Sequence, residues 1–397
     1  MSARGGRVRP VGLGVLVGAL LLVALSGLPT AIAGVPSDDG RVLQAAGCHE
    51  GVEATEAREC LVVGGKRSRP LVMLFGDSHA AQLRPALEEV ATRHQLRLAQ
   101  LTKSGCPVAV VDSLGGRVDP HPDCTSWRKS ALAVIRRMNP DTVVVASSYH
   151  YQDLQSGEGS AASVADYFKT WRSGFRKTLG SVTAAGRPGV VVVRDPPRFG
   201  NDLAACLAEK PGKSGVSCGL SRSEAVNDTN RGVWSVETAV SRGMAKTVRL
   251  DLTDEVCTSS FCSPVDVRGL PRYFDGNHFA GDFSVSLWPS VSGALAKVVR
   301  MPPSKVDGLT AQRSRGRLLL KWRKAMPGSA KNLSYRTTLT PQRGWRSKGA
   351  KSYACSGRKA RCRTGRVPAN AVYKVSVVAV TAAGASIPLK ASTRKLK

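Results

Sequence analysis

One stretch limits the possible folds of this chain more than any other: Leu71–Phe75, followed by Gly76-Asp77-Ser78-His79. Five consecutive apolar residues predict a strand buried on both faces, which is typical of a parallel sheet. Gly76 allows a sharp turn, and from Ala80 onward the apolar residues have helical spacing. Ser78 is therefore expected where the carboxyl end of a strand meets a helix N-terminus, a place where open α/β sheets bind ligands. The alternative interpretation is that Asp77 or Ser78 only caps the helix.

A second motif lies about two hundred residues later, at Asp275-Gly276-Asn277-His278. A serine hydroxyl is a weak nucleophile, so it needs a base to take its proton, and the base needs an acceptor that orients it. Asp275 and His278 can supply both groups from one tight turn. We therefore predict Ser78 as nucleophile, His278 as base and Asp275 as the orienting carboxylate. A surface turn with a solvent-facing histidine is the alternative.

Between these motifs, apolar runs alternate with amphipathic stretches, which predicts an α/β domain with helices on both faces of a parallel sheet. The expected strands are Leu71–Phe75, Leu96–Leu101, Thr142–Ser147, Gly189–Arg194 and Thr247–Leu250, and the expected helices lie near 80–93, 125–138, 163–184, 222–242 and 283–298. Four tryptophans at helical positions are expected in the core: Trp127, Trp171, Trp234 and Trp288. Segments 102–124 and 195–220 are rich in Gly, Pro and Cys, so we expect loops that wall the substrate cleft.

The pattern changes after Pro302-Pro303. Short strands are predicted from there on, at Leu318–Trp322, Ser334–Leu339, Tyr373–Val380 and Gly384–Pro388. A tryptophan on an early strand and a tyrosine that opens a late alternating strand resemble a fibronectin type III module. We therefore expect a small all-β sandwich at residues 301–397.

The N-terminal segment has the features of a secretory signal. Three arginines precede an apolar run from about Leu13 to Leu28, and Ala31-Ile32-Ala33 ends it. Residues 1–33 are therefore predicted to be a signal peptide, with an uncleaved membrane anchor as the alternative. Residues 34–69 are polar and without a strong period, so they are interpreted as an extension that packs on the next domain. No later segment is apolar enough to cross a membrane.

The ten cysteines fall into five closely spaced couples. In an exported chain this pattern favours disulfides, and neighbour pairing requires the shortest loops. The predicted pairs are Cys48–Cys60, Cys106–Cys124, Cys206–Cys218, Cys257–Cys262 and Cys355–Cys362. A metal site is the weaker alternative, because no couple has zinc-knuckle spacing and the histidines do not cluster nearby. His94 and His121 are expected at the surface.

The net charge of +29 is unevenly distributed. Residues 301–397 hold 23 lysines and arginines against a single acid, Asp307, whereas residues 34–300 hold 32 bases and 28 acids. The predicted catalytic domain is thus near neutral, and the C-terminal domain is strongly basic. Such a domain can bind anionic polymers by counterion release, or can simply be a solvated cationic surface.

The two motifs together closely resemble the SGNH (GDSL-type) esterases and acyltransferases, and in particular the SGNH domains that form extracytoplasmic tails of bacterial membrane O-acyltransferases. The residues that carry the resemblance are Gly76-Asp77-Ser78-His79-Ala80, Gly105-Cys106-Pro107, Cys124 with Trp127, Arg194-Asp195-Pro196-Pro197, Cys206 and Cys218, Asp251-Leu252, Cys257 and Cys262, and Tyr273-Phe274-Asp275 with Asn277-His278. The resemblance implies a flavodoxin-like parallel sheet over residues 70–300.

The resemblance also implies an oxyanion hole made by the backbone N–H of the nucleophile, a glycine and an asparagine. Here Ser78 and Gly105 fill the first two positions, but no asparagine follows the strand at 142–146. Ser147 or Ser148 can donate in its place, and Ser147 is the replacement we predict. His79 and His150 are the predicted substrate-contacting residues, with core packing as the alternative for His79.

These observations predict an exported serine-dependent esterase or O-acyltransferase. It would move small acyl groups, acetyl first among them, on cell-envelope glycans through a Ser78 acyl-enzyme, with no cofactor and no metal. The expected partners are an acylated envelope polysaccharide, anionic wall polymers and a separate membrane acyltransferase as acyl donor, but no nucleic acid. The alternative is a non-catalytic wall-binding protein with a degenerate SGNH fold, which the missing asparagine favours.

Overall fold

A seven-stranded sheet forms the centre of the first part of the molecule. The computed structural model describes residues 47–110, 122–151, 164–186, 188–200, 202–342 and 350–394, so the predicted signal peptide lies outside the described residues. The strands lie in the order β1-β4-β3-β5-β6-β8, and β2 pairs with β4. Their bounds are β1 His49–Glu50, β2 Cys60–Val63, β3 Leu71–Gly76, β4 Arg97–Lys103, β5 Thr142–Ala146, β6 Gly189–Val193 and β8 Thr247–Leu250.

The sheet is parallel except at β2, and its order is that of a flavodoxin-like fold, so this part of the prediction is confirmed. All six residues of β3 are buried, as expected for a strand covered on both faces. Gly76 at its end pairs with Thr102 of β4 and Ala146 of β5. The chain segments that follow these three strands therefore leave the sheet side by side.

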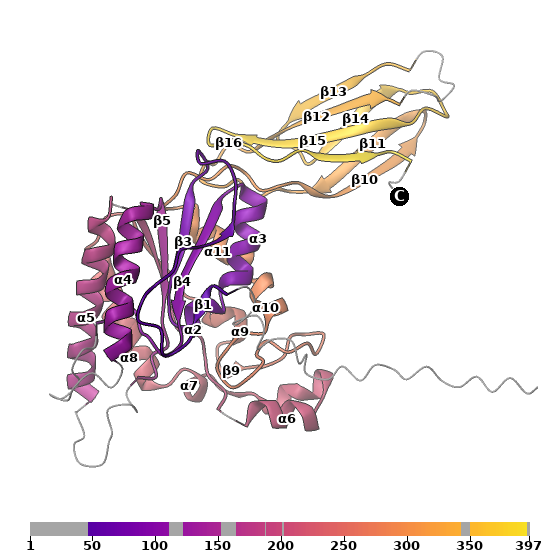
Figure 1. The fold of residues 1–397 in the computed structure, drawn as a ribbon. Coiled ribbons are helices and arrows are strands. Elements are labelled where there is room, and N and C mark those ends of the chain that lie inside the picture. Colours follow the sequence, from indigo (N-terminus) through magenta and orange to yellow (C-terminus); the bar gives the residue numbers. More distant parts are fainter. Residues whose placement is uncertain are drawn as a thin grey trace, which may run out of the picture.

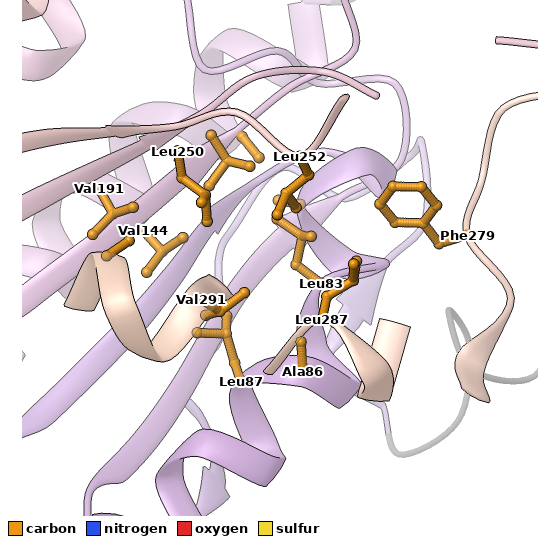
Figure 2. Close-up of a cluster of buried hydrophobic side chains, with 14 of the residues drawn as sticks. Leu83, Ala86, Leu87, Val144, Val191, Leu250, Leu252, Phe279, Leu287 and Val291 are labelled. Atoms are coloured by element: carbon orange, nitrogen blue, oxygen red, sulfur yellow. The ribbon is translucent and has the colours of Figure 1, made fainter. Parts of the chain in front are cut away.

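Helices cover both faces of the sheet (Figure 1). On one face lie α3 (Arg84–His94), α10 (Gly281–Ser286) and α11 (Trp288–Leu295), and on the other lie α4 (Pro122–Met138), α5 (Val164–Ala184) and α8 (Asp228–Arg242). Figure 2 shows the first interface, where Leu87 and Val291 of the helices meet Val144 and Val191 of the strands. Trp127 and Trp171 are fully buried in the second, and Trp234 and Trp288 are partly buried.

Several predicted helices are interrupted. The helix expected near 80–93 is divided into α2 (Ser78–Ala81) and α3, and the one expected near 283–298 is divided into α10 and α11. In both cases a proline occupies the first turn of the second helix, where its missing N–H costs no hydrogen bond. The helix expected at 222–242 is α7 (Arg222–Ala225) followed by α8.

Two segments expected to be irregular contain regular structure. The predicted loop at 195–220 includes α6 (Leu203–Glu209) and the 3₁₀ helix η2 (Gly212–Cys218). Of the predicted loop at 102–124, residues 111–121 lie outside the described residues. The N-terminal extension supplies β1 and β2, which pair with β4. The extension is thus part of the sheet rather than a segment packed on its surface.

The C-terminal part is an antiparallel sandwich of two sheets, as predicted. One sheet has the order β10-β11-β14, and the other has the order β13-β12-β15-β16 with β17 also paired to β15. The bounds are β10 Asp307–Ser314, β11 Arg317–Arg323, β12 Ser334–Pro341, β13 Tyr353–Gly357, β14 Arg361–Arg366, β15 Tyr373–Thr381, β16 Gly384–Ala385 and β17 Leu389–Ser392. Trp322 of β11 packs edge-on against Tyr335 of β12 between the sheets.

The sandwich is joined to the α/β part at the C-terminal end of α3, far from α2 in Figure 1. His94 was predicted to lie at the surface, but it is fully buried at this junction. Its Nδ1 is 2.7 Å from the Pro302 carbonyl, and its Nε2 is 3.0 Å from Ser292 Oγ. Arg93 binds Asp307 from the same helix end. His94 was misjudged because only the tertiary fold brings the linker over it.

Five disulfides join the ten cysteines in the neighbour pairs described above. One of them, Cys355–Cys362, connects β13 and β14, which belong to different sheets of the sandwich. Among the residues that the structure describes, no helix combines the length and apolarity that a membrane span requires.

Candidate active site

Ser78 lies just after the turn that follows β3, and it is the first residue of α2. Gly76 has φ +150°, and a Cβ at this position would lie 1.9 Å from the Ala146 carbonyl oxygen, so only glycine fits here. Asp77 is extended and caps α2 by accepting the His79 backbone N–H at 2.8 Å. Because Asp77 is the N-cap of α2, the Ser78 hydroxyl is not needed to cap this helix.

The loop before α10 brings His278 and Asp275 to Ser78. The Ser78 hydroxyl donates to His278 Nε2 at 2.9 Å, and His278 Nδ1 donates to Asp275 Oδ2 at 2.7 Å. The other Asp275 oxygen accepts the backbone N–H groups of Asn277 and His278 at 2.8 and 2.6 Å. Asp275 therefore fixes both the turn and the tautomer of the imidazole.

The electrostatic environment keeps this imidazole available as a base. Burial lowers the pKa of His278, and the charge of nearby His79 lowers it further, against the opposing effect of Asp275. Burial would raise the pKa of the Asp275 carboxyl, but its hydrogen bonds with His278 and Asn277 lower it on balance. A neutral imidazole with Nδ1–H held by a carboxylate has its Nε2 lone pair free to take the Ser78 proton.

A second histidine–aspartate pair lies directly behind the first. His79 Nδ1 is 2.5 Å from Asp195 Oδ1, both side chains are 4% exposed, and the His79 ring lies 4.6 Å from the His278 ring. Asp195 Oδ2 accepts the Tyr149 backbone N–H. Burial opposes the charged form of His79, but Asp195 and Asp77 raise its pKa above the ordinary value. His79 is thus buried and bound to Asp195, and its role in substrate contact stays a prediction.

Asp77 has a structural role at the serine turn. Besides the His79 N–H, its carboxylate accepts the Ser148 backbone N–H at 2.9 Å and the Tyr151 hydroxyl at 2.7 Å. The side chain is completely buried, and burial raises its pKa. Asp77 thus ties the segment after β5 to the serine turn.

The two other predicted oxyanion donors lie in the neighbouring loops. Gly105 lies in the turn after β4 and has φ +66°. The preceding residue, Ser104, donates its backbone N–H to the Glu50 carbonyl. The Ser147 hydroxyl accepts the Val108 backbone N–H at 2.7 Å and is buried. This contact gives Ser147 a structural role in holding the loop after Gly105, and its role as an oxyanion donor stays a prediction.

His49 of the N-terminal extension supports the Gly105 loop. Its Nδ1 is 2.9 Å from Thr102 Oγ1, and its Nε2 is 2.9 Å from Ser104 Oγ. Burial, then the nearby charge of His278, lower the pKa of His49 to about 4, so the ring is neutral at physiological pH. The sequence analysis missed His49, although its place next to Cys48 was a usable signal, because a disulfide fixes the residues beside it.

Gln82 was also missed. The fully buried side-chain amide of Gln82 accepts the Phe279 N–H at 2.6 Å and donates to the His79 carbonyl at 3.2 Å, and the backbone carbonyl of Gln82 accepts the Ser284 hydroxyl. It therefore connects the serine turn to the histidine loop across about two hundred residues of sequence. A glutamine among the apolar positions of an amphipathic stretch was the available signal.

The remaining candidates lie nearby with weaker roles. His150 is exposed, and its ring contacts Tyr149 edge-on, so substrate contact by His150 stays a prediction. The Asn277 backbone braces the Asp275 turn. His121 lies outside the described residues. Within the described ranges, no group of three or more histidine, cysteine or acidic side chains is arranged to hold a metal ion.

The family model described as the SGNH domain fused to AT3 domains matches residues 47–289, which confirms the resemblance drawn from the sequence. The match includes β1 and β2, which agrees with their place in the sheet. A search of curated protein sequences returns no match.

Three solved structures show similarity at low identity. The periplasmic domain of a lipopolysaccharide acetyltransferase from Salmonella ser. Paratyphi A is 16% identical, with a TM-score of 0.44 over 64% of this chain and 93% of that chain. A carbohydrate acetylesterase from Sinorhizobium meliloti is 12% identical, with a TM-score of 0.37 over 58% of this chain and 100% of that chain. The FN5 domain of Drosophila Lar is 14% identical, with a TM-score of 0.16 over 22% of this chain and 95% of that chain.

Proposed function

This chain belongs to the family of SGNH domains that occur fused to AT3 domains, and from this premise we propose that it is a serine-dependent O-acyl esterase or transferase that acts on cell-envelope glycans. The observation that carries the proposal is the hydrogen-bonded series from Ser78 Oγ through His278 to Asp275. SGNH enzymes are hydrolases or acyltransferases, and this series is what either reaction requires.

In the first half-reaction, Ser78 Oγ attacks the acyl carbonyl carbon while its proton passes to His278 Nε2. The developing oxyanion is stabilised by the backbone N–H groups of Ser78 and Gly105, because donors fixed in advance cost no reorganisation. The tetrahedral intermediate then collapses, the bond to the leaving alcohol oxygen breaks, and His278 returns the proton to that oxygen. Ser78 is left as an ester of the acyl group.

In the second half-reaction, His278 takes a proton from an incoming hydroxyl, which attacks the carbonyl carbon of the acyl-enzyme. The bond between this carbon and Ser78 Oγ then breaks, and His278 returns the proton to Ser78 Oγ. If the hydroxyl belongs to water, the reaction is hydrolysis; if it belongs to a sugar, the reaction is transfer. We propose acetyl as the acyl group, an extracytoplasmic location after removal of residues 1–33, and a separate membrane acyltransferase as donor. The five disulfides support an oxidising compartment.

The proposal is tested with p-nitrophenyl acetate. Ser78→Ala and His278→Ala are each expected to lower kcat/KM by at least about 10³-fold, since each removes a group that acts in the same step. Ser286→Ala is the matched control, because its hydroxyl is exposed and donates only to the Phe283 carbonyl. Equal turnover by Ser78→Ala and wild type would favour the alternative, a wall-binding protein with a degenerate site.

We also propose that the basic C-terminal domain holds the enzyme on anionic envelope polymers. The support is the excess of 22 positive charges over residues 301–397, which the α/β domain does not balance. Removal of residues 301–397 is expected to release the protein from isolated walls at low salt while ester hydrolysis continues. Undiminished retention of the shortened protein would contradict this part of the proposal.

A further inference from the structure

The outer face of the three-stranded sheet of the sandwich carries a concentration of positive charge. In β11 and in Arg361–Gly365 of β14, buried side chains alternate with more exposed ones, so Arg361 and Arg363 point away from the core. Five cations line a hollow of about 820 Å³ that extends from this face to the turn between β13 and β14, namely Arg317, Arg358, Lys359, Arg361 and Arg363. We refer to it as the cationic groove.

The arrangement places like charges opposite one another. Lys321 of β11 is the direct cross-strand partner of Arg361, and Arg317 is the partner of Arg366. Like charges directly opposite in a sheet destabilise it. A sheet that was selected only for stability would place acids at some of these positions, and β11 and β14 contain no acid.

The C-terminal domain holds no acid that can neutralise the groove. Asp307 is the only aspartate or glutamate in residues 301–397, and it is bound by Arg323 at 2.7 Å and by Arg93 at 3.1 Å. Its carboxylate is therefore engaged at the junction with α3. The counter-charge for the cationic groove must therefore come from outside the C-terminal domain.

The side chains indicate the chemistry of that counter-charge. Four of the five lining cations are arginines, whose planar guanidinium groups form paired hydrogen bonds with phosphate oxygens. Arg361 and Arg363 flank the buried Cys362 and project from the same face, which separates their Cα atoms by about 7 Å along the strand. The groove thus offers a row of phosphate-binding groups, with β13 and β14 fastened together by the Cys355–Cys362 disulfide beside it.

Nucleic acid is a poorer fit to the same groove. Proteins that bind single strands stack bases on aromatic side chains, and none of the described residues that line this groove is aromatic. We therefore propose that the cationic groove binds a linear phosphodiester polymer that has no bases, such as a chain of polyol phosphates. The choice of partner rests on the proposed envelope function, whereas binding itself is measured without any acyl substrate.

The test measures binding of the full chain to fluorescently labelled poly(glycerol phosphate) between 50 and 200 mM salt. Arg361→Gln/Arg363→Gln is expected to weaken binding at least tenfold and to reduce the slope of log K against log salt by about 1.5, since each phosphate contact contributes roughly 0.7–0.9. The matched control is Arg336→Gln/Lys374→Gln, which removes the same charge from exposed positions on the other sheet. The control is expected to weaken binding less than threefold.

An equal loss in both double variants, or no binding by wild type at 50 mM salt, would overturn the proposal. So would equally tight binding of poly(dT) with the same dependence on Arg361 and Arg363, which would assign the groove to nucleic acid. Ser78→Ala must bind like wild type, so a failed esterase assay cannot be mistaken for a failed groove. The groove variant must unfold at the same temperature as wild type or higher, because it removes a like-charge pair.

Discussion

Removing the charge of His79 should move the acid limb of the pH–activity profile. His278 acts as a base only when neutral, so kcat/KM falls as the pH drops through its pKa. The cationic His79 ring, 4.6 Å away, disfavours protonation of His278. His79→Gln removes that repulsion, raises the pKa of His278 and therefore shifts the acid limb to higher pH.

The size of the shift follows from the distance between the rings. Two unit charges 4.6 Å apart interact by about 2–4 kcal/mol at an effective dielectric constant of about 20–40. Since one pKa unit corresponds to 1.36 kcal/mol, the limb should move by about one to two units after partial relaxation of the site. The other charged groups around His79 are Asp77, Asp195 and Arg198, and none of them changes in this variant.

Asp195→Asn provides the discriminating comparison. If His79 is charged because Asp195 stabilises it, then Asp195→Asn discharges His79 and also moves the limb upward. If His79 is neutral in the native protein, the loss of a negative charge instead lowers the pKa of His278 and moves the limb downward. The assay is kcat/KM for p-nitrophenyl acetate from pH 4.5 to 8, with circular dichroism to show that the variants are folded. A downward or absent shift in either variant would refute the reasoning.

Three further predictions concern the groups around the site. Asp275→Asn should lower kcat by about 10²- to 10³-fold, since His278 loses its oriented tautomer. The expected loss is smaller than for a buried aspartate because the Asp275 side chain is 39% exposed. A loss of less than tenfold would contradict this prediction. Gln82→Leu should destabilise the protein by about 1–3 kcal/mol in urea unfolding and reduce kcat more than it changes KM, because a buried N–H loses its acceptor. Burial raises the pKa of Glu237 from 4.5 to about 8, so the wild-type protein loses stability as the pH rises between these values. Glu237→Gln does not lose this stability, so the free energy of urea unfolding of the variant minus that of wild type should grow by a few kcal/mol from pH 5 to pH 8. A constant difference would argue against a neutral buried carboxyl.

The parts of the fold predicted from the sequence are those whose signal is local. The apolar run at Leu71–Phe75 predicts β3 because a strand covered by helices on both sides has no polar face. The Asp275–His278 motif was recognisable because a carboxylate and an imidazole three residues apart can meet on one turn. Helix interruptions were missed where a proline in the first turn of a helix was not interpreted as a helix start.

What the sequence did not reveal depends on contacts between distant segments. His79 and Asp195 are 116 residues apart, and no periodicity relates a residue after β3 to one after β6. His49 is the first residue of the two-residue strand β1, which is too short to have a detectable alternation. His94 has the sequence neighbours of a surface residue, but the linker at Pro302 and Ser292 of α11 lie against its ring. In each case the deciding partner is set by the tertiary fold.

Covalent trapping of the nucleophile tests the central claim most directly. The protein is incubated with a fluorophosphonate, which esterifies an activated serine hydroxyl, and the site of the adduct is located by mass spectrometry of peptides. A single adduct on Ser78, formed at least about 10²-fold more slowly in His278→Ala, is the predicted result, because the imidazole 2.9 Å away must take the hydroxyl proton. No adduct, or an adduct on another residue that forms equally fast in both proteins, would contradict the account.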